Sequence, residues 1–266
     1  MDGSHGDILS TAKQSATWDL QLRQLLLPKL DHDASECEDA IAFDLHTARF
    51  AVTDGATEAF HAQQWARNLA EHWVQKEATL TLEEFRNWVA TEGRELHDSW
   101  NGLTMSWYSE EKARTGSFAA FVGVELDLKS STPSWKAIAL GDTCLLHCRG
   151  GALLKSFPLS RSESFNSSPI LAASNAALHE STMSSAMVES GVCENDDVLL
   201  LASDAAASWC LQRFENQDFD PDFLATKDGV KDDEELRRFF DGERQAGRIR
   251  NDDLAIVRIE IKRRVT

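Results

Sequence analysis

The chain lacks long hydrophobic runs, and none approaches the roughly 18 consecutive apolar residues that a membrane span requires. It is also poor in basic residues, with 27 Lys and Arg against 44 Asp and Glu. The resulting net charge of −17 disfavours binding to nucleic acid and to anionic membrane surfaces, because both need a positively charged protein surface. We therefore expect neither a nucleic-acid nor a membrane partner, and the acidity is typical of a soluble, cytoplasmic protein.

Several common motifs are also absent. The five cysteines are odd in number and show no Cys-x-x-Cys spacing, so reduced, buried thiols are expected rather than a disulfide framework or zinc knuckle. The N-terminus has no basic segment followed by an apolar run, so no signal peptide is predicted. The sequence contains no His-Glu-x-x-His, no His-rich cluster and no Gly-x-Ser-x-Gly, which disfavours an unrelated metal hydrolase.

Apolar periodicity predicts the secondary structure that is present. Two amphipathic helices are expected, one after residue 58 and one capped by Thr81, and a polar helix is expected over residues 106–114. Residues 18–30 fit either a strand or a short helix. Short apolar runs separated by turn residues predict strands over residues 40–43, 48–53, 117–126, 135–140, 143–148 and 152–156, the last four forming an antiparallel meander.

The C-terminal part is expected to add further elements. Residues 158–190 are rich in Ser, Ala and Asn and resist assignment, which favours a functional or mobile loop. A buried strand over residues 198–203, helices over 205–214 and 232–245, and a closing strand over 254–261 follow. With no linker or repeat in the chain, we predict a flexible arm (residues 1–17) and one domain (residues 18–266). The fold class is α+β with two packed sheets covered by helices.

Carboxylates recur where apolar runs end. Glu38 and Asp39 precede a strand, Asp54 and Asp204 each follow one, and Asp252 with Asp253 precedes the last, while Asp142 separates two strands. Each could simply cap a turn. Strand ends on one rim of a sheet converge in space, however, and clustered carboxylates raise one another's pKa values unless cations neutralise them. The set therefore predicts a site for hard cations such as Mg²⁺ or Mn²⁺, two of which can support displacement at phosphorus.

Six segments, in order, resemble the motifs of the metal-dependent serine/threonine protein phosphatases of type 2C, in particular a bacterial-type branch. The resemblance spans roughly residues 18–262. It rests on Cys-Glu-Asp-Ala (37–40), Ala-Val-Thr-Asp-Gly (51–55), Thr-Gly-Ser-Phe-Ala (115–119), the Gly-Asp-Thr turn ending at residue 143, Leu-Leu-Leu-Ala-Ser-Asp (199–204) and Asn-Asp-Asp-Leu (251–254).

The resemblance implies an αββα sandwich and a water bridging two divalent cations, Mn²⁺ or Mg²⁺, that attacks phosphoserine or phosphothreonine with no protein nucleophile. The implied substrate is a phosphorylated protein, and the implied phosphatase would oppose a serine/threonine kinase. The implied ligands are Asp54, as the bridge, with the Gly55 carbonyl, Asp204 and Asp252. Glu38 and Asp39 would act at the rim, and Asp142 would hold a possible third ion.

Departures from the family pattern leave a second function open. Ala34 stands where many members carry a phosphate-binding arginine, so phosphate binding is either weaker or supplied elsewhere, with His32, Arg149 and Arg161 as candidates. Asp204 is followed by Ala205 rather than glycine, Ser208 replaces a further acidic residue, and the closing motif is Asp252-Asp253 rather than Asp-Asn. The alternative to a phosphatase is a catalytically weak relative that binds phosphoproteins or regulates a partner.

Overall fold

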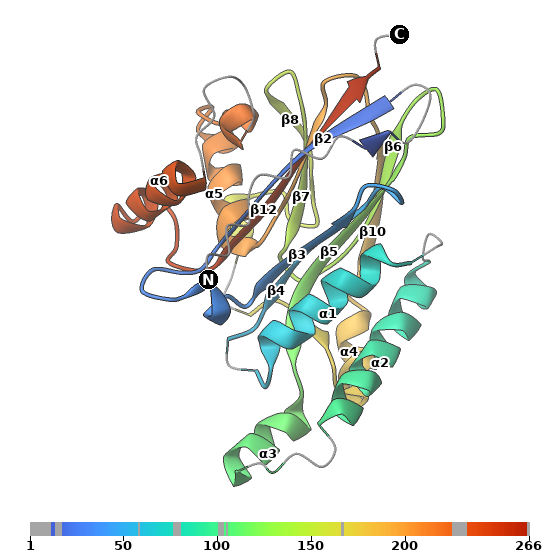
Figure 1. Cartoon of the computed structure of the whole chain (residues 1–266), viewed down its shortest axis with the longest axis vertical. Coiled ribbons are helices and arrows are strands. Elements are labelled where there is room, and N and C mark those ends of the chain that lie inside the picture. The colour runs from blue at the N-terminus through green and yellow to red at the C-terminus, as the bar shows by residue number, and fades with distance from the viewer. Residues whose placement is uncertain are drawn as a thin grey trace, which may run out of the picture.

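Two antiparallel sheets lie face to face at the centre of the molecule (Figure 1). The computed structural model describes residues 12–13, 18–57, 59–76, 81–100, 104, 106–165, 168–224 and 233–264. In strand order, the first sheet comprises β1 (Ala12–Lys13), β2 (Trp18–Leu27), β12 (Leu254–Arg263), β11 (Val198–Ala202), β7 (Cys144–Arg149) and β8 (Ala152–Phe157). The second comprises β10 (Met187–Val192), β6 (Ser134–Leu140), β5 (Phe118–Asp127), β4 (Arg49–Gly55) and β3 (Asp39–Asp44), with β9 (Ala172–Ala173) paired to β5.

Helices cover the outer face of each sheet. Side chains of α5 (Asp204–Glu215) and α6 (Asp233–Gln245) pack on the first sheet. Those of α1 (Ala62–Val74), α2 (Leu82–Ser99) and α4 (His179–Met183) pack on the second. The polar helix α3 (Trp107–Thr115) has no buried residue and projects from one end (Figure 1). The predicted αββα sandwich is confirmed.

Strands buried on both faces explain the uninterrupted apolar runs in the sequence. In β11, Leu199 and Leu201 pack into the core between the sheets, while Val198, Leu200 and Ala202 pack against α5 and α6. Because successive strand residues point to opposite faces, a strand covered on both sides is apolar at every position. Strand β12 shows the same alternation. It pairs with β11, and these two strands lie at the centre of the first sheet.

Most predicted elements are confirmed. Residues 18–30, left open between strand and helix, contain β2. Helix α2 begins at the predicted cap, where the Thr81 hydroxyl accepts a hydrogen bond from the Glu84 backbone and Glu84 Oε2 accepts one from the Thr81 backbone. This reciprocal capping satisfies backbone N–H groups that the first helical turn cannot pair. Of the predicted arm, only residues 12–13 lie within the described residues; they form β1.

Two predictions were wrong. The expected four-strand meander is divided, because β5 pairs with β6 in one sheet whereas β7 pairs with β8 in the other. The link at Gly141–Asp142 therefore crosses between the sheets; local apolar patterning does not specify which strand is the partner. Residues 158–190 are not simply a loop, since they contain β9, α4 and most of β10. Strand β10 is an edge strand with an exposed face, so it lacks the apolar run that marks a buried strand.

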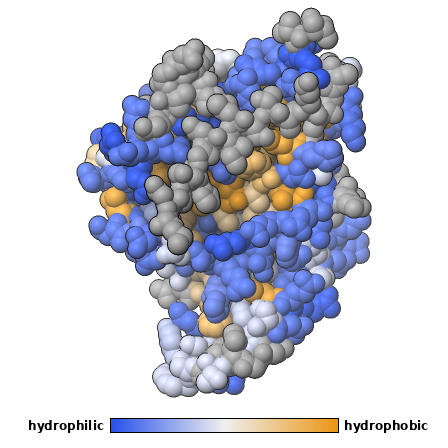
Figure 2. Space-filling model, viewed as in Figure 1, coloured by the Kyte–Doolittle hydropathy of each residue, from blue (hydrophilic) through white to orange (hydrophobic). Residues whose placement is uncertain are grey.

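Hydrophilic residues cover most of the face shown in Figure 2, and hydrophobic side chains are visible between the two layers. In the described part of the chain, none of the helices combines the length and the apolar character needed to cross a membrane. All five cysteines are free and buried, as expected.

Candidate metal centre

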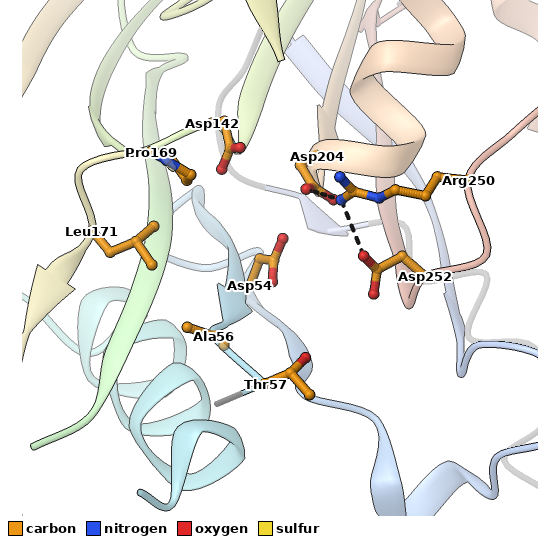
Figure 3. A pocket seen from close by; sticks show the side chains of 10 residues that line it. Asp54, Ala56, Thr57, Asp142, Pro169, Leu171, Asp204, Arg250 and Asp252 are labelled. Atoms are coloured by element: carbon orange, nitrogen blue, oxygen red, sulfur yellow. Dashed lines mark hydrogen bonds and ion pairs between the residues drawn. The ribbon is translucent and has the colours of Figure 1, made fainter. Parts of the chain in front are cut away.

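A cavity of about 330 Å³ opens where strand ends of the two sheets meet, and four aspartates line it (Figure 3). They come from four places in the fold: Asp54 from the end of β4, Asp142 from the β6–β7 link, Asp204 from the start of α5, and Asp252 from the segment before β12. One carboxylate oxygen each of Asp54, Asp142 and Asp204 lies within 4.8 Å of the other two. Residues about 200 positions apart in sequence thus share one small volume.

Asp54 is fixed by the pairing of β3 with β4, which sets it directly opposite Asp39. The next residue, Gly55, donates its backbone N–H to the Glu38 carbonyl oxygen at 3.2 Å. A Cβ at Gly55 would lie 2.8 Å from the Ala62 carbonyl oxygen and 2.9 Å from that of Glu38. Only glycine allows this approach of α1 to the end of β4, so the Asp-Gly pair is a packing requirement as well as a site feature.

Asp142 is positioned by the crossover between sheets. Gly141 has φ +97° and packs against Ala120, so the chain turns sharply there out of the second sheet. Thr143 and β7 then continue in the first sheet. Asp142 is 4% exposed and lies on the cavity wall. The crossover is what directs this carboxylate toward Asp54 and Asp204 (Figure 3).

Asp204 is the first residue of α5, where unpaired helical N–H groups favour a negative charge. Its Oδ1 accepts a hydrogen bond from the backbone N–H of Ala205. The preceding Ser203 occupies the N-cap position of α5 and is tied to β12, because its hydroxyl accepts a hydrogen bond from the Ala255 N–H at 2.9 Å. The start of α5 is therefore held against the strand that follows Asp252.

Asp252 and Asp253 have different surroundings. Both carboxylate oxygens of Asp253 accept backbone N–H bonds at 2.8 Å, Oδ1 from Lys29 and Oδ2 from Glu38. Asp252 instead lines the cavity, and its carbonyl oxygen accepts a 2.6 Å bond from the buried Arg244 of α6. Of the two, Asp252 is the one available to a ligand, in line with the choice made from the sequence.

The electrostatics of the cluster are strongly unfavourable to ionised carboxylates. Burial is the main cause in each case, and neighbouring carboxylates add to it. It raises the pKa of Asp39 and Asp54 well above the ordinary value, and it raises that of Asp142 to about 7. The pKa of Asp252 is also raised, by burial and then by the charge of Asp204. Asp39 Oδ2 is buried without a hydrogen-bond partner.

These properties fit hard divalent cations. Four carboxylates in one cavity, a buried carboxylate oxygen without a partner and raised pKa values all indicate a site built for compensating positive charge. Oxygen donors are the ligands that Mg²⁺ and Mn²⁺ prefer. The donor set present is thus suitable for the predicted ions.

The remaining sequence candidates lie elsewhere. Glu38 is absent from the cavity wall, and its carboxylate faces Lys29 Nζ at 3.8 Å. None of the three residues suggested to bind phosphate lines the cavity: His32 lies 3.9 Å from Glu36, Arg161 pairs with Glu163, and Arg149 pairs with Asp197. The structure therefore places none of the three on the cavity wall.

Sequence reasoning missed Arg250, which lines the cavity and forms ion pairs with the carboxylates of both Asp204 and Asp252 (Figure 3). The distance from Arg250 Nη2 to Asp252 Oδ2 is 3.0 Å. The available signal was its position two residues before Asp252, in a bend where the Asp252 backbone N–H donates to the Arg250 carbonyl oxygen at 3.0 Å.

The αββα sandwich of this chain is a fold that it shares with solved serine/threonine phosphatases of type 2C. The catalytic domain of the serine/threonine phosphatase PstP, in complex with two manganese ions, has a TM-score of 0.58 at 14% identity, covering 92% of this chain and 100% of that one. PppA of Pseudomonas aeruginosa gives 0.59 at 14%, covering 96% and 100%.

A serine/threonine phosphatase of Staphylococcus aureus gives a TM-score of 0.57 at 11% identity, covering 98% of this chain and 99% of that one. No protein-family model and no curated protein matches the sequence. At these identities the likeness establishes the fold, and the resemblance predicted from the six motifs is confirmed at that level.

Proposed function

We propose that this protein is a metal-dependent phosphoprotein phosphatase that hydrolyses phosphoserine and phosphothreonine. The observation that carries the proposal is the convergence of Asp54, Asp142, Asp204 and Asp252 in one cavity of a type 2C fold. The manganese ions of PstP, a serine/threonine phosphatase of the same fold, support it.

The cofactors we propose are two divalent cations, Mn²⁺ or Mg²⁺, with a possible third. Asp54, the Gly55 carbonyl, Asp204 and Asp252 would hold the first two, and Asp142 would serve the third. Asp39 and Glu38 would act from the rim, directly or through water. Asp39 is the better supported of these two, because one of its buried oxygens has no hydrogen-bond partner.

When bound, such cations acidify a water between them and stabilise charge during in-line displacement at phosphorus. The four aspartates would hold these cations and balance their positive charge. Because burial raises the pKa of Asp142 to about 7, the cation-free cluster retains protons near neutrality, and loading it should release them. Burial likewise raises the pKa of the nearby Cys144 to about 12, so this thiol offers no nucleophile.

The substrate we propose is a phosphorylated protein, the product of a serine/threonine kinase, and the compartment is the cytoplasm. The cavity opens on the solvent-facing rim of the sandwich, where a phosphorylated side chain of another protein can enter.

The test measures hydrolysis of p-nitrophenyl phosphate and of a phosphoserine peptide with Mn²⁺, with Mg²⁺ and with EDTA. We expect turnover that requires the cation. Asp54→Asn and Asp204→Asn should lower it by more than the ~10–100-fold loss typical of a residue that only supports a metal ligand. Asp218→Asn, a surface substitution distant from the cavity, is the matched control and should leave turnover unchanged.

One observation favours the alternative, a catalytically weak phosphoprotein-binding relative. Ala34 is exposed and offers no charge where many type 2C members carry an arginine. Wild-type protein that binds Mn²⁺, and binds a phosphoserine peptide, but turns over neither substrate would support the alternative over the enzyme.

A further inference from the structure

Arg250 is the only basic residue among the described residues that line the cavity. It lies in the short segment between α6 and β12, and its Nη2 donates a hydrogen bond to Asp204 Oδ2 and forms an ion pair with Asp252 Oδ2. Its guanidinium therefore stands between two of the proposed cation ligands (Figure 3). In this position it neutralises part of the carboxylate charge.

The guanidinium is not fully used by these contacts. Both involve Nη2, and the N–H groups of Nε and Nη1 form no hydrogen bond in the described part of the chain. The side chain is 51% exposed, so it lies at the mouth of the cavity and not in its floor. An arginine has five N–H donors in a planar fork that matches the oxygens of a phosphate group.

A phosphate group needs positive charge to enter this cavity. Four aspartates line it, and a phosphate monoester carries nearly two negative charges at neutral pH. The residues first considered for phosphate binding are committed elsewhere: Arg149 to the buried Asp197, and Arg161 to Glu163. Within the described chain, Arg250 is the basic side chain in place to contact phosphate oxygens.

We propose that Arg250 is the phosphate-binding residue of this site, and that its guanidinium neutralises Asp204 and Asp252 when no cation is bound. The inference rests on the proposed function. Cations and Arg250 then compete for the same two carboxylates. Loading the site frees the guanidinium for phosphate, so the cation and the substrate bind cooperatively through one side chain.

This competition has a measurable consequence in the absence of substrate. Replacing Arg250 removes a half-exposed ion pair, and such pairs are weak, so the apparent Mn²⁺ affinity should rise by roughly two- to fivefold. Phosphate affinity should change in the opposite direction. Loss of charge-assisted bonds should weaken binding of inorganic phosphate to the Mn²⁺-loaded protein by about tenfold or more.

The experiment compares wild type, Arg250→Gln and Arg250→Lys by titration calorimetry, first with Mn²⁺ alone and then with inorganic phosphate at saturating Mn²⁺. Arg248→Gln is the matched control: it makes the same charge change two residues earlier, at a side chain that pairs with Glu243 outside the cavity. Arg250→Lys keeps the charge but loses the fork, so its phosphate affinity should be intermediate. Thermal melts confirm that each variant is folded.

Weaker phosphate binding in Arg250→Gln, with tighter Mn²⁺ binding and with Arg248→Gln like wild type, would support the inference. Phosphate binding equal to wild type in a folded Arg250→Gln protein would overturn it. Weaker Mn²⁺ binding in that variant would also overturn it, because Arg250 would then support the ligand segment. A wild-type protein that binds neither Mn²⁺ nor Mg²⁺ would overturn both this inference and the proposed function, whereas either of the two overturning results for Arg250→Gln leaves the proposed function standing.

Discussion

Removing one carboxylate from the cluster should make the cation-free protein more stable. The variant is Asp142→Asn, whose side chain keeps nearly the same shape while losing the charge. A pKa of about 7 in place of 3.8 corresponds to at most about 4 kcal/mol, at ~1.36 kcal/mol per pKa unit. Because neighbouring carboxylates share the retained protons, we expect a gain of about 1–3 kcal/mol in the free energy of unfolding at pH 8.

The sign follows from the direction of the shift. The folded protein holds the Asp142 proton more tightly than the unfolded chain does, so wild-type stability falls as pH rises between 3.8 and about 7. The advantage of Asp142→Asn should therefore grow over that window and be largest above pH 7. At pH 5 it should be about two-fifths of its value at pH 8.

Urea unfolding in EDTA, followed by tryptophan fluorescence at pH 5 and pH 8, measures both quantities. Asp218→Asn removes a 53% exposed carboxylate from a surface pair and should change stability by less than about 1 kcal/mol at either pH. Adding Mn²⁺ at 100 times its dissociation constant should stabilise wild type by about 2.7 kcal/mol for each site filled, and stabilise Asp142→Asn by no more than it stabilises wild type. An Asp142→Asn protein that is less stable than wild type at pH 8 in EDTA would refute the charge-repulsion argument.

Three further substitutions test how the site is held. Gly55→Ala places a Cβ 2.8 Å from the Ala62 carbonyl oxygen and should cost about 1–3 kcal/mol of stability, measured by urea unfolding, and lower phosphatase turnover as well. Asp253→Asn leaves at least one of two backbone N–H groups without an acceptor, so it should cost about 1–3 kcal/mol in the same assay without removing a cavity residue. Asp197→Asn breaks a buried pair with Arg149 far from the cavity and should cost about 3 kcal/mol with Mn²⁺ affinity unchanged. Burial alone would raise the pKa of Asp197, but the hydrogen bond from Arg149 and its other partners lower it. The stabilisation from this ionised carboxylate is therefore present at neutral pH and is lost only as pH falls below about 4.

The parts of the fold that sequence could predict are those in which local pattern and burial coincide. The run at residues 198–202 is apolar throughout because both faces of β11 are covered, and Asp204 follows where α5 begins. The cap at Thr81 was equally predictable, since its partner Glu84 is three residues away. In each case the structure is fixed by contacts between residues close together in the sequence, or it depends only on whether a residue is buried.

The parts that could not be predicted depend on contacts between distant segments. The sequence of residues 134–149 does not predict that β6 pairs with β10 while β7 pairs with β11. Because of this pairing, Asp142 lies at the junction of the two sheets and not in a hairpin turn. The edge strand β10 carries no apolar run because one side of it faces solvent. Pairing partners are set by the whole fold, so the neighbours of Asp142 could be known only from the structure.

The two adjacent aspartates before β12 show why the site's charge balance needed the structure as well. Asp253 is saturated by the backbone of residues that precede β3, and this anchors the segment so that Asp252 and Arg250 are left on the cavity side. The family motif indicated which of the two aspartates is the ligand. It also placed the phosphate-binding arginine at position 34, near the N-terminal end of the chain. The fold brings residues 38 and 253 together, so a basic residue at position 250 can reach the cavity from the opposite end of the chain. The absence of an arginine at position 34 therefore does not mean that the cavity lacks a positively charged side chain, because Arg250 provides one.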